Sequence, residues 1–354
     1  GKIENAGYPG WSDNIIEANS GRYFKNSALW GGVNFSRSVV HYYGFNPDTV
    51  YNDILMKIDK SLIKQRFIYA DAYIKFVNTD IDSSSLDYKF RLDYKFTGDY
   101  FKRKEQDIEF TGFLSKNLEL LNITKSQNLG LKINADFVSQ DILNVQNHNN
   151  SLISLQPFLN TKFGFFDINI GGNASITADS ISYLYFYPQA EIHFRLIRNI
   201  LDIYGGYNGN INRNDFRSLS KENPFVSPNI PSSFSYNKSE VYGGINASIS
   251  KNIDFFGRLS NKNIDNMHFF VREYNDFSPA QKWLNRFTSV YDDVRILKIS
   301  SGLAYQQQER LKISLGGSWN EYYMTDEMQP WHKSPYEIYL SAKYNIQNKI
   351  IANA

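Results

Sequence analysis

The sequence predicts an all-β fold, an antiparallel transmembrane β-barrel of the outer-membrane type with about 16 strands visible in the chain. Apolar and polar residues alternate with a period of two along many segments, as on strands whose two faces meet different surroundings. These segments run for about 10 to 14 residues, whereas strands of globular proteins most often have about five to six. Short and long connections take turns between them, which is the hairpin rule of outer-membrane barrels.

The clearest alternation lies in residues 86–97. Even positions are apolar or aromatic, from Leu86 to Phe96, and odd positions are charged or hydroxylic. The charged positions are Asp87, Lys89, Arg91, Asp93 and Lys95. At ~3.3 Å per residue and a tilt of ~40°, the apolar face covers about 25 Å, the height of the apolar band on such a barrel. We therefore expect lipid on the apolar face and a hydrated interior on the charged face.

The same alternation returns in further segments of similar length. They are residues 128–137, 166–176, 184–195, 241–249, 311–319 and 336–346. Their polar positions carry Lys132, Asp136, Glu191, His193 and Arg195. With the charges of 86–97, these are the candidates for side chains that face the lumen, because Arg or Lys at mid-bilayer on the lipid face costs about 2–4 kcal/mol. Two interpretations stay open: a hydrated interior of mutually paired charges, or the mixed-sign lining of a solute pathway.

Connections sort into tight turns and looser segments. Clear examples of tight turns are Lys25-Asn26, Gly164-Phe165 and Lys251-Asn252. Looser segments, which we interpret as outer loops, fall near residues 43–64, 98–105, 140–151, 213–235 and 273–290. The spacing within Pro47–Ile63 predicts a short helix in one of them. Pro157 and Pro188 interrupt otherwise clean strands, so we expect a local bulge at each.

Aromatic residues near strand ends suit the two girdles at the membrane interfaces. They are Trp30, Tyr42, Tyr43, Tyr100, Phe101, Trp319, Tyr322, Tyr323 and Trp331. Sugar stacking in outer loops is the alternative role for the same side chains.

We expect a single outer-membrane barrel domain over residues 1–354, truncated at both ends and without a plug domain. The chain begins with Gly1-Lys2, which is not a translation start. Its last residues, 350–354, stop just as a new strand begins.

Composition and motifs exclude several function classes. With 38 basic and 36 acidic residues the formal charge is only +2, so no nucleic-acid footprint is expected. Cysteine is absent, which removes disulfides and thiolate metal sites. No serine lies in a nucleophile motif, so we predict no catalytic residue and no enzyme. Glu191-x-His193-x-Arg195 would need further ligands from neighbouring strands to hold a metal, and we predict neither metal nor cofactor.

Four stretches share a further likeness. They are residues 22–27 (RYFKNS), 36–44 (SRSVVHYYG), 217–228 (RSLSKENPFVSP) and 285–294 (NRFTSVYDDV). Together they resemble Bacteroidetes outer-membrane barrel proteins labelled TonB-dependent receptors. The resemblance implies an outer-membrane location and a larger parent with a periplasmic segment and further strands. A TonB-coupled transporter also needs a plug domain and an energy-coupling box, and we expect neither in this chain.

These observations predict an integral barrel of the bacterial outer membrane for solute passage or uptake, either TonB-dependent-receptor-like or porin-like. The alternative is a non-conducting structural or assembly component of an outer-membrane complex. A secreted, soluble all-β binding protein is a third class, which the long strands argue against. Expected partners are outer-membrane lipid, a small solute, and a periplasmic energy-coupling or lipoprotein partner, with no nucleic acid.

Overall fold

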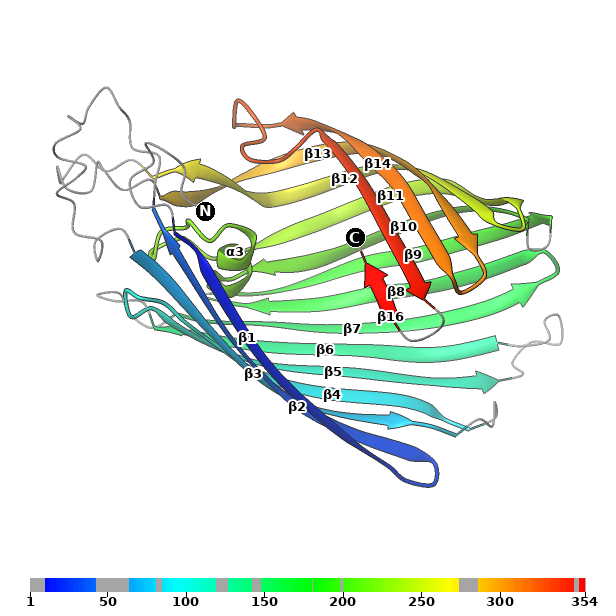
Figure 1. Ribbon diagram of the computed structural model, residues 1–354, viewed down its shortest axis with the longest axis horizontal. Helices are drawn as coiled ribbons and strands as arrows, with labels where there is room; N and C mark the ends of the chain where they lie inside the picture. Colours follow the sequence, from blue (N-terminus) through cyan, green and yellow to red (C-terminus); the bar gives the residue numbers. More distant parts are fainter. Residues whose placement is uncertain are drawn as a thin grey trace.

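Antiparallel strands hydrogen-bond in chain order from β1 to β16 within one sheet, so neighbours in the sheet are neighbours in the sequence (Figure 1). The computed structural model describes residues 10–42, 64–80, 85–118, 127–141, 148–179, 181–197, 200–273, 286–346 and 350–353. The strands are β1 (Ser12–Tyr23), β2 (Ser27–His41), β3 (Lys64–Asn78), β4 (Asp87–Gly98), β5 (Lys104–Leu118), β6 (Gln127–Asp141), β7 (His148–Phe163), β8 (Phe166–Ala178), β9 (Ser182–Ile197), β10 (Leu201–Asn214), β11 (Ser233–Ser250), β12 (Ile253–Arg272), β13 (Phe287–Gln307), β14 (Leu311–Met324), β15 (Tyr336–Ile346) and β16 (Ile350–Asn353). Their number and pairing confirm the predicted all-β, antiparallel fold.

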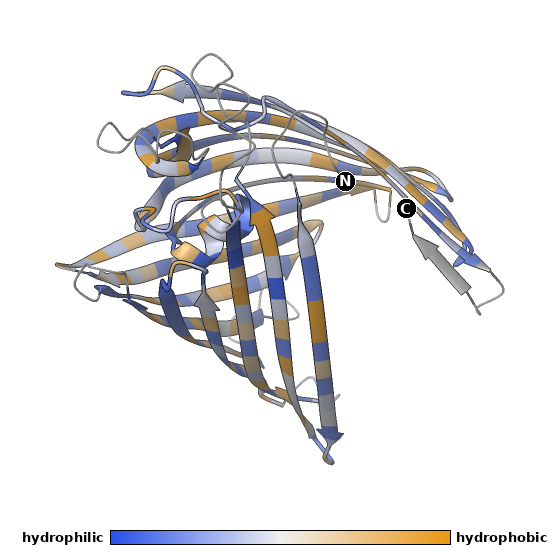
Figure 2. Cartoon of the chain, turned by 60° about the vertical axis from the view of Figure 1, so that its left-hand side comes forward, coloured by the Kyte–Doolittle hydropathy of each residue, from blue (hydrophilic) through white to orange (hydrophobic). Residues whose placement is uncertain are grey.

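The sheet curves into a trough with a convex and a concave side, and hydrophobic and hydrophilic residues alternate along its strands (Figure 2). Among the described strands no pairing links β1 to β16, so the sheet is not closed. In the middle of β4 the apolar side chains Leu92 and Tyr94 are exposed, by 49% and 42%. Asp93 and Thr97, which point to the opposite side, are buried. An apolar surface this extensive on the convex side needs a non-aqueous neighbour.

Aromatic contacts along the strands hold the apolar side of the wall together. The ring of Phe90 stacks on those of Tyr88 and Phe110, with centroids 6.0 and 6.2 Å apart. Phe76 of β3 continues the row against Tyr88 at 5.4 Å. Such cross-strand pairs stabilise a sheet beyond its backbone ladder, and here they extend over three neighbouring strands.

The tight turns predicted at Lys25-Asn26, Gly164-Phe165 and Lys251-Asn252 join consecutive strands as expected. Gly164 has a φ of +58°, a left-handed conformation that glycine adopts without strain. The helix predicted over Pro47–Ile63 lies outside the described residues.

The bulges predicted at Pro157 and Pro188 are wrong, since strand register passes through both positions without a shift. Pairing between β9 and β10 ends at Ala190, so the missing N–H of Pro188 removes no ladder bond on that side. Beside Pro157 the pairing of β7 with β8 is interrupted between Leu155 and Phe158 and then resumes in the same register. The ladder therefore accommodates Pro157 beside a local gap in the pairing with β8, and Pro188 beyond the end of the pairing with β10.

The connection from β10 to β11, predicted as an outer loop, instead folds onto the concave side of the sheet (Figure 1). It contains the helix α3 (Phe216–Glu222), which a capping box starts. The carboxylate of Asp215 accepts from the Ser218 N–H at 2.6 Å, and the Ser218 hydroxyl accepts from the Asp215 N–H at 3.0 Å. No described helix is long and apolar enough to cross a membrane. We call residues 215–232 the inner segment.

We predict that Phe90→Arg impairs membrane assembly far more than Arg91→Phe. Phe90 lies on the convex side, where Arg costs about 2–4 kcal/mol against lipid, whereas Arg91 pairs with Asp93 at 2.6 Å on the opposite side. The measurement is the fraction of protein that keeps its compact, heat-sensitive mobility on gels after folding into lipid vesicles. The reverse ranking of the two variants would mean that the two sides of the wall are inverted.

Candidate functional site on the concave face

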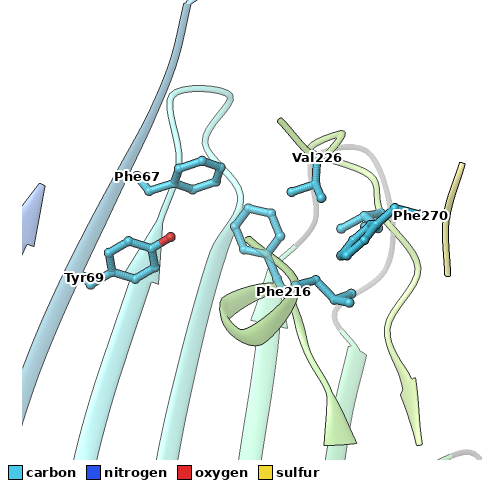
Figure 3. Close-up of a cluster of buried hydrophobic side chains, with 7 residues drawn as sticks. Phe67, Tyr69, Phe216, Val226 and Phe270 are labelled. Atoms are coloured by element: carbon cyan, nitrogen blue, oxygen red, sulfur yellow. The ribbon is translucent and has the colours of Figure 1, made fainter. Parts of the chain in front are cut away.

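The inner segment is anchored first by apolar contacts that reach across the trough. Figure 3 shows Phe216 and Val226 of the segment beside Phe67 and Tyr69 of β3 and Phe270 of β12. Each of these five side chains is at most 5% exposed. Strands β3 and β12 are far apart in the order of the sheet. The segment therefore bridges the concave side and is not a loose loop above it.

The sequence predicted that Tyr42 belongs to an interfacial girdle. In the structure it contacts the inner segment instead. Its ring is fully buried, and its hydroxyl donates to the carbonyl of Val226 at 3.0 Å. A girdle residue keeps its polar end in the wet interface, whereas this hydroxyl is used to hold the inner segment. The strand-end position of Tyr42 could not distinguish the two roles.

Arg217 forms the strongest polar tie between the inner segment and the wall. Its guanidinium donates to both carboxylate oxygens of Asp71 on β3, at 2.7 and 2.8 Å. It also donates to the Thr97 hydroxyl at 3.1 Å and to the Phe96 carbonyl at 3.2 Å on β4. Both bonds to Asp71 come from the same nitrogen, Nη2, and hydrogen bonds between two ionised groups are stronger than those between neutral groups. Arg217 thus fixes α3 against two strands at once.

Glu105 on β5 receives the start of α3. Its two carboxylate oxygens accept from the backbone N–H groups of Phe216 and Arg217, at 2.9 and 3.1 Å. These N–H groups have no partner within the helix. A carboxylate of the wall thereby completes the hydrogen bonding of a helix that belongs to a different part of the chain.

Arg213, at the end of β10, collects three carboxylates where the inner segment begins. It lies 2.7 Å from Asp136, 3.5 Å from Asp107 and 3.2 Å from Asp215. Its side chain is only 6% exposed. Desolvation of such a cation is costly unless several acceptors surround it, and the acidic positions of β5 and β6 supply them.

Arg103 holds the far end of the inner segment from the connection between β4 and β5. Its guanidinium donates to the carbonyls of Pro228 and Ile230, at 2.7 and 3.0 Å, and to the Gln140 side chain at 3.0 Å. It also lies over the Phe216 ring, 4.2 Å from the centroid. Burial lowers the pKa of Arg103 to about 10, which leaves it cationic at neutral pH.

Glu222 ties the last turn of α3 to the opposite wall. Its carboxylate accepts from His268 of β12 at 2.8 Å and from Lys333, between β14 and β15, at 2.6 Å. The hydrogen bond from His268 is the largest cause that lowers the pKa of Glu222 to about 2, and Lys333 adds to it. The carboxylate is therefore charged throughout the neutral and mildly acidic range.

The predicted candidates on β4 form a paired ladder on the same side as the inner segment. Alternation puts Asp87, Lys89, Arg91, Asp93 and Lys95 on the face of Thr97, which contacts Arg217. Arg91 pairs with Asp93, and the Lys95 ammonium lies 2.5 Å from Glu109 and 3.2 Å from Asp107. Asp87 and Lys89 are exposed near the start of the strand.

The candidates on β9 form a second ladder, away from the inner segment. His193 lies between two carboxylates, with Nε2 3.1 Å from Glu191 and Nδ1 2.8 Å from Asp202. Glu191 also accepts from the hydroxyl of Tyr242, and Arg195 pairs with Asp167. Within the described part of the chain, no group of three or more His, Asp or Glu side chains could hold a metal ion.

A cavity of about 370 Å³ opens on the concave side between β6 and β11. We call it the amide cavity, because five Asn and Gln residues line it. Its polar lining comprises Lys132, Gln156, Asn169, Gln189, Glu191, Asn208, Asn210, Glu240 and Tyr242. Two of the predicted candidates, Lys132 and Glu191, thus meet in one place, and Asp136 lies apart from them with Arg213.

Sequence reasoning missed the arginines that hold the inner segment and the amides of the cavity. Arg103, Arg213 and Arg217 lie in or beside connections, where no periodicity marks a buried side chain. The stretch 217–228 drew attention only as a resemblance. An amide on the polar face of a strand carries no charge, so a pattern of ionisable positions does not include it.

Neither a model of any protein family nor any curated protein matches this sequence. Solved structures do match in fold. The FrpB iron transporter from Neisseria meningitidis aligns with a TM-score of 0.63 at 9% identity, over 96% of this chain and 58% of its own. The ferripyoverdine receptor of the outer membrane of Pseudomonas aeruginosa aligns at 0.61 and 10%, over 95% and 52%. The siderophore receptor PiuA from Acinetobacter baumannii aligns at 0.61 and 9%, over 97% and 63%.

The chain has the fold of outer-membrane receptor barrels. It spans between about half and two thirds of the length of these structures. At such low identity the likeness is one of fold alone. The neighbours are receptors and transporters and not enzymes, and they support the outer-membrane location predicted from the alternation.

Arg217→Met should release the inner segment from the wall. The variant keeps an unbranched apolar side chain but leaves Asp71 without its donor. Breaking a fully buried pair costs about 3–5 kcal/mol, and less is expected here because the Asp71 side chain is 24% exposed. Proteolytic cleavage within residues 215–232 should become at least about tenfold faster. The matched control Lys238→Met breaks an exposed pair with Asp265 and should leave the rate unchanged; equal rates in both variants would contradict the anchoring role.

Glu222→Gln should reduce the hydrogen-exchange protection of α3 at pH 7, by about 1 kcal/mol or less because the side chain is 44% exposed. A carboxyl whose pKa is lowered in the folded state stabilises it fully above its ordinary value, near 4.5, and loses that effect as the pH falls to about 2. The difference between variant and wild type should therefore vanish over this interval. Glu17→Gln on the edge strand β1 should change nothing at any pH. A difference for Glu222→Gln that persists at pH 2 would show that charge is not the cause.

Proposed function

We propose that this chain forms the wall of an integral outer-membrane barrel through which a polar solute is taken up. The observation that carries the proposal is the division of the sheet into an apolar convex side and a concave side that gathers paired charges, an open cavity and the inner segment. A wall built only to hold a protein in the membrane does not require an open polar cavity. The fold shared with an iron transporter and two siderophore receptors agrees with this function.

In this proposal residues 1–354 form a single barrel domain. Ten candidate residues line its lumen. They are Asp87, Lys89, Arg91, Asp93, Lys95, Lys132, Asp136, Glu191, His193 and Arg195. Both signs are present and most are paired within the wall, so weak charge selectivity is expected for bulk ions. The inner segment narrows the lumen at the end where it packs, and solute passes beside it or when it moves.

Two modes of uptake fit this arrangement. A porin-like barrel passes solute by diffusion, and a TonB-dependent-receptor-like barrel adds a plug and a periplasmic energy-coupling partner. The sequence resemblance favours the second mode. Outer-membrane lipid is the partner of the convex side in both.

The second candidate function is a non-conducting structural or assembly component, with a lipoprotein or another membrane protein as its partner. The specific observation that favours it is the inner segment, which fills part of the concave side. Arg217 of the segment pairs with Asp71, and Arg213, at the end of β10 beside the segment, pairs with Asp107 and Asp136. A filled barrel can act as a scaffold without passing anything.

Planar-bilayer conductance of the intact protein, purified from membranes, distinguishes the two functions. We predict a measurable channel in the wild type or, if the inner segment closes it, in the double variant Arg217→Met/Glu222→Gln. Release of the segment should raise conductance by at least about twofold, because it widens the narrowest part of the path. Lys238→Met again serves as the control. No channel in any of these folded proteins would overturn the uptake proposal and favour the scaffold.

A further inference from the structure

The amide cavity offers hydrogen bonds that the wall itself does not use. Within the described residues, the side chains of Gln156, Asn169 and Asn208 make no hydrogen bond to another protein group, although all three line the cavity. A primary amide presents two donors and an acceptor. The three amides come from three strands, β7, β8 and β10, and line the same cavity. Its volume of about 370 Å³ is in the range of small-molecule sites.

The carboxylates of the cavity are already neutralised by their neighbours. Glu191 accepts from Tyr242 and lies 3.1 Å from His193. Glu240 lies 3.0 Å from Arg258 and 3.3 Å from Lys262. A cationic ligand therefore gains little from either group.

Lys132 is the exception. No described carboxylate pairs with its ammonium group, which lies 5.5 Å from the centroid of the Phe158 ring. Phe158 in turn stacks on Phe113 at 5.9 Å, so the ammonium lies over one ring of a stacked aromatic pair. Among the described residues, the cavity lining thus contains one positive charge without a carboxylate partner, beside the unused amides.

We propose that the amide cavity binds a hydroxyl-rich solute with isolated acidic groups, of the chemical class of short acidic oligosaccharides. Hydroxyl groups both donate and accept, as the amides do, and one carboxylate of the solute pairs with Lys132. An apolar solute would cover the amides without satisfying their hydrogen bonds, which is costly. This inference rests on the proposed uptake function only in one respect, that the bound solute is the one that is taken up. Binding itself does not require transport.

Equilibrium titration calorimetry on the intact protein in detergent tests the proposal with three probes. Trigalacturonate is hydroxyl-rich and acidic, maltotriose is hydroxyl-rich and neutral, and tricarballylate is acidic without hydroxyl groups. We expect trigalacturonate to bind most tightly, maltotriose about tenfold more weakly, and tricarballylate not measurably. Lys132→Gln should reduce the affinity for trigalacturonate about tenfold and leave that for maltotriose unchanged. The matched control is Lys162→Gln. Lys162 lies on the same face of β7 as Gln156 but outside the cavity lining, so this variant should change the affinity for neither trigalacturonate nor maltotriose.

A variant of the amides completes the test. Gln156→Met should weaken both trigalacturonate and maltotriose by a similar factor, because both lose the same hydrogen bonds. Absence of binding by all three probes at 10 mM, an unchanged affinity for trigalacturonate in Lys132→Gln, or preferred binding of tricarballylate would each overturn the proposal. If the probes bind as expected but no variant conducts, the binding site stands and the uptake function is rejected. Failure of the binding proposal and failure of the uptake proposal can therefore be told apart.

Discussion

Exclusion of charge from one side of the sheet is the constraint on which the rest of this structure depends. Successive side chains of a strand point to opposite sides, so a convex side that meets lipid favours charged residues on the concave side. β4 shows the consequence, with Leu92 exposed outside and Asp93 buried inside. The concave side therefore collects charges of both signs at close distance, and they must find partners among themselves.

Contacts of the inner segment with the wall satisfy many of these charged groups. Arg103, Arg213 and Arg217 reach carboxylates and carbonyls that the wall and the segment leave unpaired, and Glu105 satisfies the first N–H groups of α3. Arginine suits this task because its planar fork binds two oxygens at once and stays charged when buried. The apolar anchor around Phe216 adds the burial of area that ion pairs alone do not provide.

The concave face is consequently divided into two zones with different chemistry. Around the inner segment, most polar groups are hydrogen-bonded or ion-paired with other groups of the protein. Between β6 and β11 they are partly unused, and the amide cavity opens there. Of the ionisable candidates, Asp93 and Asp136 belong to the first zone, whereas Lys132 and Glu191 belong to the second. A solute that enters the trough meets a structural network at one end and available hydrogen bonds further along.

The amino-acid sequence by itself determined the strands, their antiparallel order and their two sides, because alternation is a local property of consecutive residues. It also determined the tight turns, as at Gly164, since a left-handed glycine acts within a few residues. Only the tertiary structure decided that the β10–β11 connection folds inward, that Tyr42 is buried, and which charges pair. Arg217 and Asp71 lie 146 positions apart in the chain, and their contact depends on how the whole sheet curves, which no local pattern encodes.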